Sequence, residues 1–262
     1  VGAGAVSLGC AAMLGSPWSL SATVWGVACG LMWTGGQVFV LWAFRAWGVS
    51  RTMPLTTALQ LLLNATLGVS LFGEWRAPGA LILGVVALAL IMLGAAACSW
   101  QERTGPGPTA AQRRDGLLAT AASAVLYGSY PSLLRAVEVP PAHAVGPMGL
   151  GLLAGAGLCA LILPRCAPLR GPRIVPAALA GGLWAVGNAL MLRSTAAVGV
   201  ASGFTLSQLG FVLATLGGLT ILGEERTGRE RTAVAAGVAA AVVGLVLMGL
   251  ATGMDTGASP SQ

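Results

Sequence analysis

The sequence predicts an all-α, polytopic helical membrane protein that shows nine spans of a ten-helix fold, built from two inverted repeats of five helices. The first observation is composition: 56% of the 262 residues are hydrophobic and 8% are charged, whereas a soluble domain carries about 25% charged residues. The second is arrangement, because charged clusters alternate with apolar runs of about 20 residues, the length that crosses a bilayer. The third is an internal repeat.

The first repeat is predicted within residues 1–99 and contributes four helices. Its apolar runs cover residues 1–15, 21–47, 54–72 and 77–99. These runs are continuous and too long for the strands of a membrane barrel, which have about 10 residues each. We expect the first helix of this repeat to be missing, because the second half has five runs and the sequence opens with Val1 inside an apolar run.

A polar linker over residues 100–115, WQERTGPGPTAAQRRD, separates the halves, since proline, glycine and charge are concentrated there. The second repeat is predicted over residues 116–252 with five helices. Its apolar runs cover residues 116–137, 145–163, 175–196, 202–222 and 231–252. Residues 253–262 are predicted to form a disordered tail.

The two halves share a pattern of residues at a separation of about 150 positions. The paired residues are Trp33 with Trp184, Gln37 with Asn188, Gly48 with Gly199, Gln60 with Gln208, and Glu74 with Glu224. An odd number of helices in each repeat places the two repeats in opposite orientations. Inverted repeats are typical of secondary transporters, which hold the substrate near the membrane midplane between the repeats.

Arginine distribution predicts the orientation in the membrane. All 14 basic residues are arginine, and only Arg76, Arg135 and Arg193 fall on the side opposite the linker. Because basic loops stay in the cytoplasm, we predict a multi-pass protein of the cytoplasmic membrane with a cytoplasmic linker and an external C-terminus. The same bias explains the sequence pI of 9.7 without nucleic acid as a partner.

Three motifs, GLMWTGGQ, GVSRTMPLTTALQL and LGVSLFGEW, resemble the glucose/ribose porter group of the drug/metabolite transporter superfamily. The resemblance extends from residue 1 to about residue 252. LYGSYPS, at residues 126–132, is similar to the Gly-Trp-Gly-Ser-x-Pro element that such proteins carry in their first span. The resemblance implies a ten-helix inverted-repeat fold that moves a monosaccharide across the cytoplasmic membrane, with proton-coupled uptake as the usual description of the family.

Amides and aromatic residues inside the spans are the candidate sugar ligands. Carboxamides both donate and accept hydrogen bonds, and residues four apart on a helix share a face. The candidate substrate-binding residues are Trp33, Gln37, Gln60, Asn64, Tyr127, Tyr130, Trp184, Asn188 and Gln208. The alternative is that the amides join helices by hydrogen bonds and that the tyrosines lie at the membrane interface.

Glu74 and Glu224 are the candidate coupling residues, because each follows a glycine at the end of a span. The alternative is a loop carboxylate paired with Arg76 or Arg226, two residues further on. No acidic residue falls in the middle of a predicted span, where proton-driven carriers usually hold one. Proton-coupled and facilitated transport therefore both stay open.

Other functional classes fit the sequence less well. An enzyme needs converging His, Asp, Glu or Cys side chains, yet the only histidine, His143, falls in a predicted loop, and the five cysteines lack metal-ligand spacing. No cofactor or metal is predicted, and no phosphate-binding P-loop motif is present. The predicted partners are the lipid bilayer and a sugar, with another small polar metabolite or an amino acid as the alternative cargo.

Several further residues are assigned structural roles from their positions. Ser50, Thr52 and Ser202 precede predicted helix starts and are interpreted as helix caps. Five tryptophans outside the amide pattern are interpreted as residues of the membrane interface. They are Trp18, Trp25, Trp47, Trp75 and Trp100.

Overall fold

The computed structural model describes residues 1–13, 15, 18–100, 102, 108–162, 174–210 and 227–258, without the side chains of residues 50, 51 and 255–258. Within these residues the chain forms helices and no strands, as the all-α prediction requires. The helices are α1 (Gly2–Met13), α2 (Leu20–Trp47), α3 (Val49–Phe72), α4 (Ala80–Ser99), α5 (Ala110–Ala136), α6 (Pro141–Ile162), α7 (Ile174–Val198), α8 (Val200–Ser207) and α10 (Gly228–Ala258).

Seven helices of the described chain are long and apolar enough to cross a membrane. They are α2, α3, α4, α5, α6, α7 and α10, so the protein is a polytopic helical membrane protein. The first predicted span differs, because α1 has only 12 residues. The span predicted over residues 202–222 begins within α8, and its residues 211–222 lie outside the described part of the chain.

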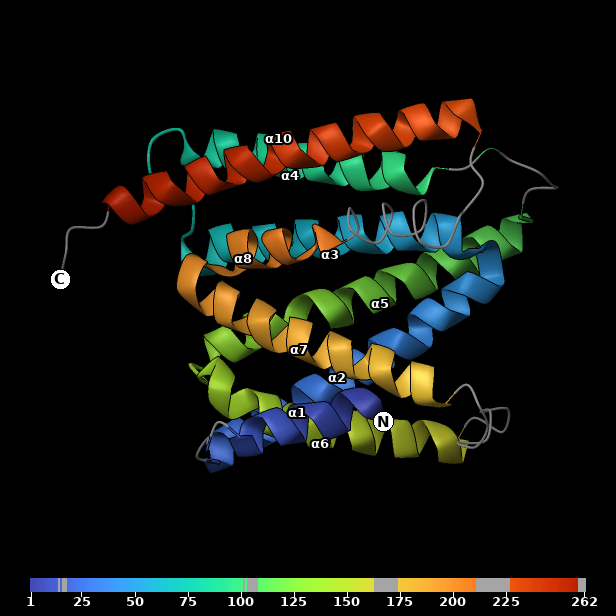
Figure 1. Cartoon of the computed structure of the whole chain (residues 1–262), viewed down its shortest axis with the longest axis vertical. Coiled ribbons are helices and arrows are strands. Elements are labelled where there is room, and N and C mark those ends of the chain that lie inside the picture. The colour runs from blue at the N-terminus through green and yellow to red at the C-terminus, as the bar shows by residue number, and fades with distance from the viewer. Residues whose placement is uncertain are drawn as a thin grey trace.

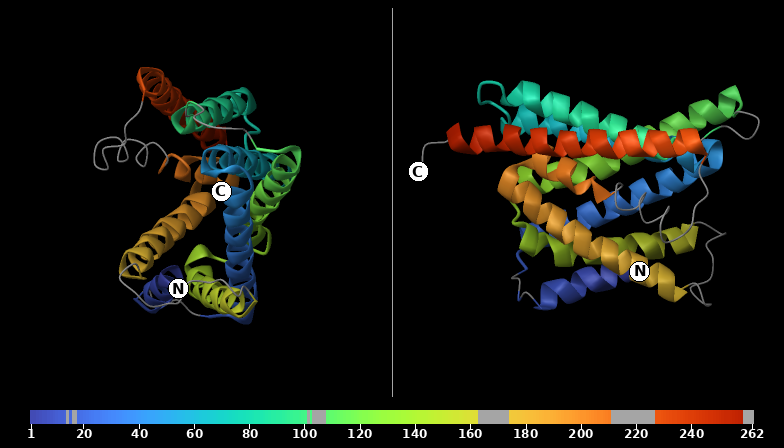
Figure 2. Two further views of the ribbon diagram at one scale, coloured as in Figure 1. Left: turned by 90° about the vertical axis from the view of Figure 1, so that its right-hand side faces the viewer. Right: turned by 45° about the horizontal axis from the view of Figure 1, so that its top comes forward.

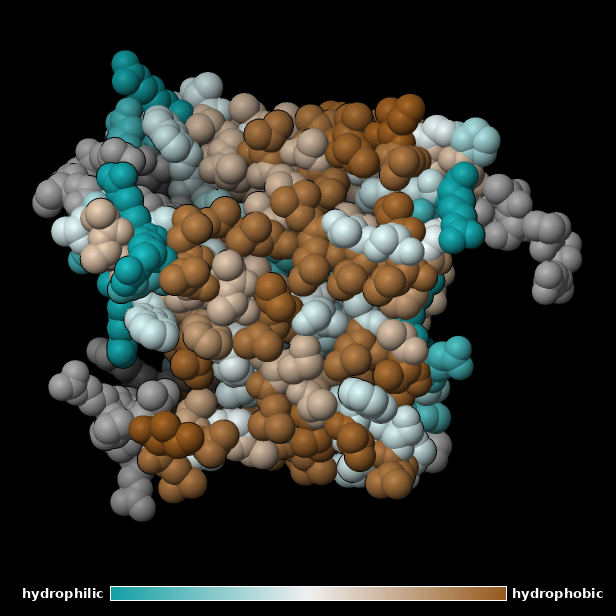
Figure 3. Space-filling view, turned by 180° about the vertical axis from the view of Figure 1, so that it is seen from behind, coloured by the Kyte–Doolittle hydropathy of each residue, from teal (hydrophilic) through white to brown (hydrophobic). Residues whose placement is uncertain are grey.

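The helices run roughly side by side along one direction (Figure 1). Helices α4 and α10 pack together at one edge of the bundle, and α1 and α6 pack together at the opposite edge, as both further views also show (Figure 2). Helices α2, α3, α5, α7 and α8 lie between these two pairs. On the face shown in Figure 3, apolar side chains form a broad band across the middle, with polar residues gathered toward the two helix ends. This band is what lipid contact requires.

Helix boundaries follow local capping chemistry. The Ser19 side chain accepts a hydrogen bond from the Ala22 amide at the start of α2. Thr109 and Gln112 form a reciprocal capping box at the start of α5, so this helix begins inside the segment predicted as linker. Pro141 opens α6, where its missing N–H costs nothing.

Two sequence predictions at helix ends were wrong. His143 lies in the first turn of α6 and not in a loop. Helix α10 continues to Ala258, six residues into the segment that was predicted to be disordered. Residues 259–262 lie outside the described residues.

Glycine pairs set the close approach of the two outer helix pairs. A Cβ atom on Gly4 would lie 2.8 Å from the Gly149 carbonyl oxygen, and one on Gly149 would lie 2.8 Å from the Gly4 carbonyl oxygen. Gly94 and Gly237 show the same reciprocity, at 2.6 and 2.7 Å. All four distances are shorter than real Cβ contacts. Small residues therefore bring α1 against α6 and α4 against α10 as they do in membrane helix dimers.

Gly48 and Gly199, which are paired in the sequence repeat, have nearly identical backbone angles. Gly48 has φ 95° and ψ 158° before α3, and Gly199 has φ 95° and ψ 161° before α8. This region of backbone space is essentially restricted to glycine. Each glycine connects a long helix to the next one by the same sharp turn.

Candidate functional site

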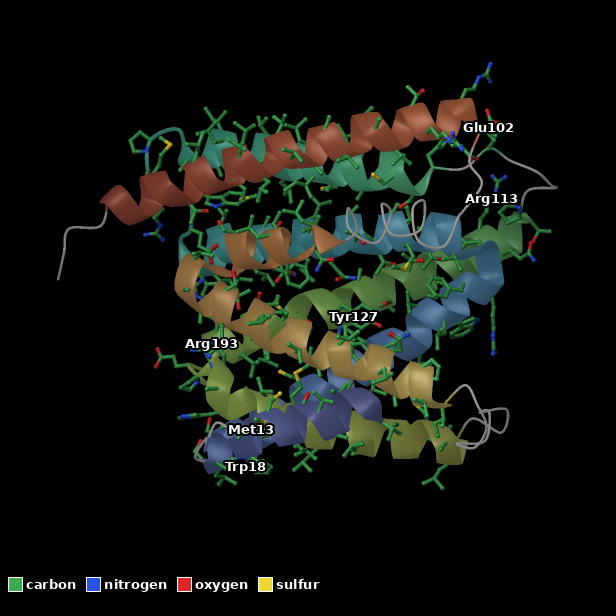
Figure 4. All side chains as sticks on the ribbon, viewed as in Figure 1. Met13, Trp18, Glu102, Arg113, Tyr127 and Arg193 are labelled. Atoms are coloured by element: carbon green, nitrogen blue, oxygen red, sulfur yellow. The ribbon has the colours of Figure 1, made fainter. Side chains whose placement is uncertain are left out.

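The predicted tryptophans meet in the middle of the bundle, where α2, α5 and α7 come together. The Trp33 and Trp184 rings are 4.2 Å apart between centroids, and the Trp33 ring lies 5.6 Å from that of Tyr127. Tyr127 lies about midway between the two helix ends of the molecule (Figure 4). Trp33, Trp184 and Tyr127 are here called the aromatic cluster.

Gln37 joins the aromatic cluster through a hydrogen bond. The Tyr127 hydroxyl donates to Gln37 Oε1 at 2.5 Å. Gly36 makes this contact possible, because a Cβ atom there would lie 2.8 Å from the tyrosine ring. The absence of a side chain at position 36 thus lets the α5 tyrosine reach the amide of α2.

Asn188 is satisfied by the second tyrosine of α5. The Tyr130 hydroxyl donates to Asn188 Oδ1 at 2.6 Å, and Asn188 Nδ2 contacts the Met148 sulfur atom at 3.4 Å. Tyr130 and Asn188 are 4% and 5% exposed. The two amides of the sequence repeat therefore bond to tyrosines that are three residues apart on one helix.

Gln60 and Asn64 form a separate polar group between α3 and α5. The Ser132 hydroxyl donates to Asn64 Oδ1 at 3.4 Å, and Asn64 Nδ2 donates to the Gln60 carbonyl oxygen at 2.9 Å. Gly128 lets the two helices approach, since a Cβ atom there would lie 3.2 Å from Asn64 Nδ2. Asn64 is fully buried, so this group extends the polar interior toward α3.

No contact among the described residues joins Gln208 to either of these two groups. It follows α8 as its C-cap, and its Nε2 lies 3.4 Å from the Ser207 hydroxyl. Its predicted sequence partner, Gln60, faces α5 instead, where its backbone lies close to Gly128. The two repeats therefore differ at this position.

Buried hydroxyls add to the polar interior. Thr56 on α3 and Ser123 on α5 have buried hydroxyl oxygens with no hydrogen-bond partner in the described structure. Ser123 precedes Tyr127 by four residues and so shares its helix face. Most buried polar groups have a hydrogen-bond partner, so each of these two hydroxyls can take a further hydrogen bond.

Glu74 connects the two halves of the bundle. Its carboxylate accepts hydrogen bonds from the amides of Val200 and Ala201, at 2.7 and 2.9 Å, and pairs with Arg135 at 2.5 Å. Glu74 is 8% exposed. A carboxylate at a helix N-terminus is stabilised by the free amides and the helix dipole, so Glu74 caps α8. The ion pair with Arg76 that the sequence suggested is replaced by one with Arg135, and Glu224 lies outside the described residues.

Three structural assignments from the sequence were wrong. Trp75 is buried, not at the interface: its Nε1 donates to Ser202 Oγ at 3.1 Å. Ser202 lies inside α8 and also accepts a hydrogen bond from the Thr252 hydroxyl at 2.9 Å, so it is a bridge and not a cap. Thr52 likewise lies within α3 and accepts from Trp47 Nε1. Trp18 and Trp100 are about half exposed.

Metal ligation finds no support among the described residues. No group of three or more His, Cys, Asp or Glu side chains there could hold a metal ion. The site consists of amides, hydroxyls and aromatic rings inside a membrane protein.

Comparison with known proteins places the chain in a family. The family model described as sugar transport protein matches residues 1–251. The chain belongs to the sugar transport protein family. This confirms the resemblance to sugar uptake proteins that was drawn from the three motifs. The family has a transport function, which is not an enzymatic kind of function.

Individual relatives of this sugar transport family member carry uptake names. The chain is 37% identical to a putative sugar uptake protein of Listeria innocua over 227 residues, 86% of this chain and 77% of that protein. It is 34% identical to the glucose uptake protein GlcU of Bacillus subtilis over 234 residues, 89% of this chain and 80% of that protein. A solved crystal structure aligns with TM-score 0.63 and 23% identity, covering 94% of this chain and 85% of that one, which shows the fold alone.

The structure of this sugar transport protein brings to the site several residues that the sequence did not indicate. Met148 contacts Asn188, Ser132 contacts Asn64, and Arg135 pairs with Glu74. A methionine or serine within an apolar run does not by itself indicate a place in a binding site. One sequence feature did point to Gly36, because a Gly-Gly pair directly precedes the candidate ligand Gln37.

Proposed function

We propose that the protein is a secondary transporter that moves a monosaccharide across the cytoplasmic membrane by alternating access. The observation that carries the proposal is the central cluster, made of the Tyr127–Gln37 and Tyr130–Asn188 pairs and the two tilted indoles of Trp33 and Trp184. Its Tyr127 lies about midway between the two helix ends (Figure 4). The family membership and the glucose uptake names of relatives support a sugar as the cargo.

The chemistry of the cluster suits a sugar. Amide and phenol groups donate and accept hydrogen bonds to hydroxyls, while the indole faces offer apolar surface to the C–H groups of the ring. Without substrate, the amides and tyrosines satisfy one another. Binding then exchanges hydrogen bonds rather than exposing buried polar groups, which would cost about 1–3 kcal/mol for each group.

The proposed motion rocks the two repeats about the bound sugar. The reciprocal glycine contacts at the two outer helix pairs lack side chains between the facing helices. In the proposed motion the two repeats slide against each other at these contacts. In the proposed orientation the linker is cytoplasmic and the C-terminus is external, as the arginine distribution indicates.

The role of Glu74 bears on proton coupling. Its carboxylate is engaged by two amides of α8 and by Arg135, an arrangement that favours a structural role over proton transfer. We therefore propose that Glu74 is a cap and that coupling, where present, resides elsewhere in the chain. Facilitated transport remains the second mechanism.

Uptake of radiolabelled glucose by proteoliposomes tests the proposal. Saturable uptake is expected, and competition by unlabelled ribose, other hexoses and amino acids defines the cargo. Imposing a pH gradient separates the two mechanisms, because only coupled uptake accelerates when the outside is acidic. Uptake of an amino acid with no response to any sugar would contradict the assignment.

Substitutions of the two amide residues test whether they bind the substrate. We expect Gln37→Ala and Asn188→Ala each to reduce kcat/KM by at least about tenfold, which corresponds to the loss of about one hydrogen-bonding group. Thr66→Ala is the matched control, because the Thr66 hydroxyl is exposed and bonds only to its own helix at Leu62. Wild-type uptake in both amide variants would assign these residues to helix packing instead.

A further inference from the structure

A pocket of about 250 Å³ opens at one end of the bundle, between α5 and α7 and beside the first turn of α6. Its floor is apolar and includes Pro131 and Leu134 of α5 and Leu192 of α7. Arg135 and Glu138 are at its charged rim, and Ala196 of α7 is part of its wall. None of these residues belongs to the central cluster.

The floor of the pocket lies directly above one part of the central cluster. Pro131 follows Tyr130 in α5, and Leu192 lies one helical turn beyond Asn188 in α7. The Tyr130–Asn188 hydrogen bond of 2.6 Å therefore connects α5 to α7 just beneath the floor. Separation of these two helices would join the pocket to the central cluster.

The rim offers polar contacts that suit hydroxyl groups. Arg135 supplies N–H donors and Glu138 supplies carboxylate acceptors. Glu138 is exposed and has φ 54°, which is uncommon for a residue with a side chain. Strained backbone of this kind clusters at ligand sites. Together with the apolar floor, the rim resembles the combination of polar and flat apolar surfaces that binds sugars.

The position of the pocket indicates which side of the membrane it faces. It lies at the C-terminal end of α7, where Arg193 and the Trp18 region are found, opposite the end that holds Glu102 and Arg113 (Figure 4). The arginine-rich end is the cytoplasmic one in the proposed orientation. The pocket therefore opens to the outside.

We propose that this pocket is the outer access subsite of the transporter, where a monosaccharide binds before it reaches the central cluster. The Tyr130–Asn188 bond is the barrier that opens between the two positions. This inference rests on the proposed function and adds a second sugar position, together with residues that the sequence did not indicate.

Cysteine labelling tests the subsite in cells that express the full chain. Ala196→Cys places a thiol in the pocket wall, and Ala197→Cys is the matched control, because Ala197 is also exposed on α7 but does not line the pocket. A bulky, membrane-impermeant thiol reagent is added outside, and uptake of radiolabelled glucose is compared before and after labelling. The unsubstituted chain, treated in the same way, controls for its own cysteines.

We expect labelling to reduce uptake by Ala196→Cys about tenfold relative to its own unlabelled state, with little change for Ala197→Cys. Saturating glucose should slow the labelling of Ala196→Cys. Glu138→Cys provides a second variant at the rim with the same expected block. Full uptake after labelling of both pocket variants, or a block that requires reagent inside the cell, would overturn the subsite while leaving sugar transport intact. Absence of sugar uptake by the unsubstituted chain would overturn the proposed function itself.

Discussion

At the residue scale, two tyrosines of α5 supply hydrogen bonds to the partly buried amide of Gln37 on α2 and to the buried amide of Asn188 on α7. Tyr127 donates to Gln37, and Tyr130 donates to Asn188. Burying an amide without a partner costs several kcal/mol, on the order of 2–7. The tyrosine hydroxyls offset this cost, and they link α2 and α7 to one face of α5.

The Tyr130→Phe substitution should weaken sugar binding. It leaves Asn188 Oδ1 without its donor, at a cost of about 1–3 kcal/mol, and removes a hydroxyl that the substrate would use. We expect a several-fold higher KM for glucose and a lower melting temperature in detergent. Ser129→Ala is the control, because its hydroxyl bonds only to the Val125 carbonyl of its own helix. An unchanged KM would show that Tyr130 does not contact the sugar.

The Glu74→Gln substitution should destabilise the protein more than it slows transport. A neutral amide weakens both the cap on α8 and the ion pair with Arg135, which together contribute about 2 kcal/mol. We expect a lower melting temperature and an unchanged response of uptake to a pH gradient. Glu102→Gln is the control, because its partner Arg229 is 3.7 Å away and largely exposed, and surface pairs contribute little. Selective loss of the pH-gradient response would assign Glu74 to coupling.

At the scale of elements, the outer helix pairs depend on glycine more than on hydrophobic matching. Gly94 of α4 and Gly237 of α10 face each other so closely that neither has room for a Cβ atom. Lipid provides no hydrophobic drive for helix association, so close packing of backbones supplies the attraction. The orientation of α10 against α4 is therefore set by small residues.

The Gly237→Leu substitution should separate α4 from α10. Its Cβ would lie 2.7 Å from the Gly94 carbonyl oxygen, and overpacking of this kind costs about 1–3 kcal/mol. The matched control is Gly249→Leu in the same helix, where no atom lies within 4 Å of the added Cβ. We expect a lower melting temperature for the first variant only. Equal melting temperatures would show that the two helices adjust without cost.

At the scale of the whole molecule, the two ends of the bundle differ in charge. Glu102 and Arg113 mark the end that carries the linker, while Arg193 lies at the other end. Because basic residues are retained in the cytoplasm, the excess of arginine on the linker side of the sequence supports the proposed orientation. The outer access subsite depends on it as well.

Reporter fusions measure the orientation directly. A periplasmic or extracellular reporter placed after Gln262 should be active, and the same reporter placed in the linker at residue 105 should be inactive. A cytoplasmic reporter should give the reverse pattern at both positions. Activity of the cytoplasmic reporter after Gln262 would reverse the assignment of the pocket to the outside.

The sequence by itself determined the helical class and most helix positions. Apolar runs of spanning length are a local property of the chain, so α2 and α7 begin and end within a few residues of their predicted limits. The equivalence of Trp33 and Trp184 in the repeat was also visible in the sequence, whereas the contact between their rings was not. Linker and tail boundaries were less accurate, since capping residues such as Thr109 extend helices into polar segments.

Only the tertiary structure decided which groups meet. Hydropathy does not specify which face of a membrane helix contacts another helix, since lipid and protein interior are similarly apolar. The partnership of Glu74 with α8 and Arg135, and the burial of Trp75 against Ser202, arise between segments more than 60 residues apart. Such contacts depend on close helix approach at glycines and on the fold of both repeats together, which no local pattern encodes.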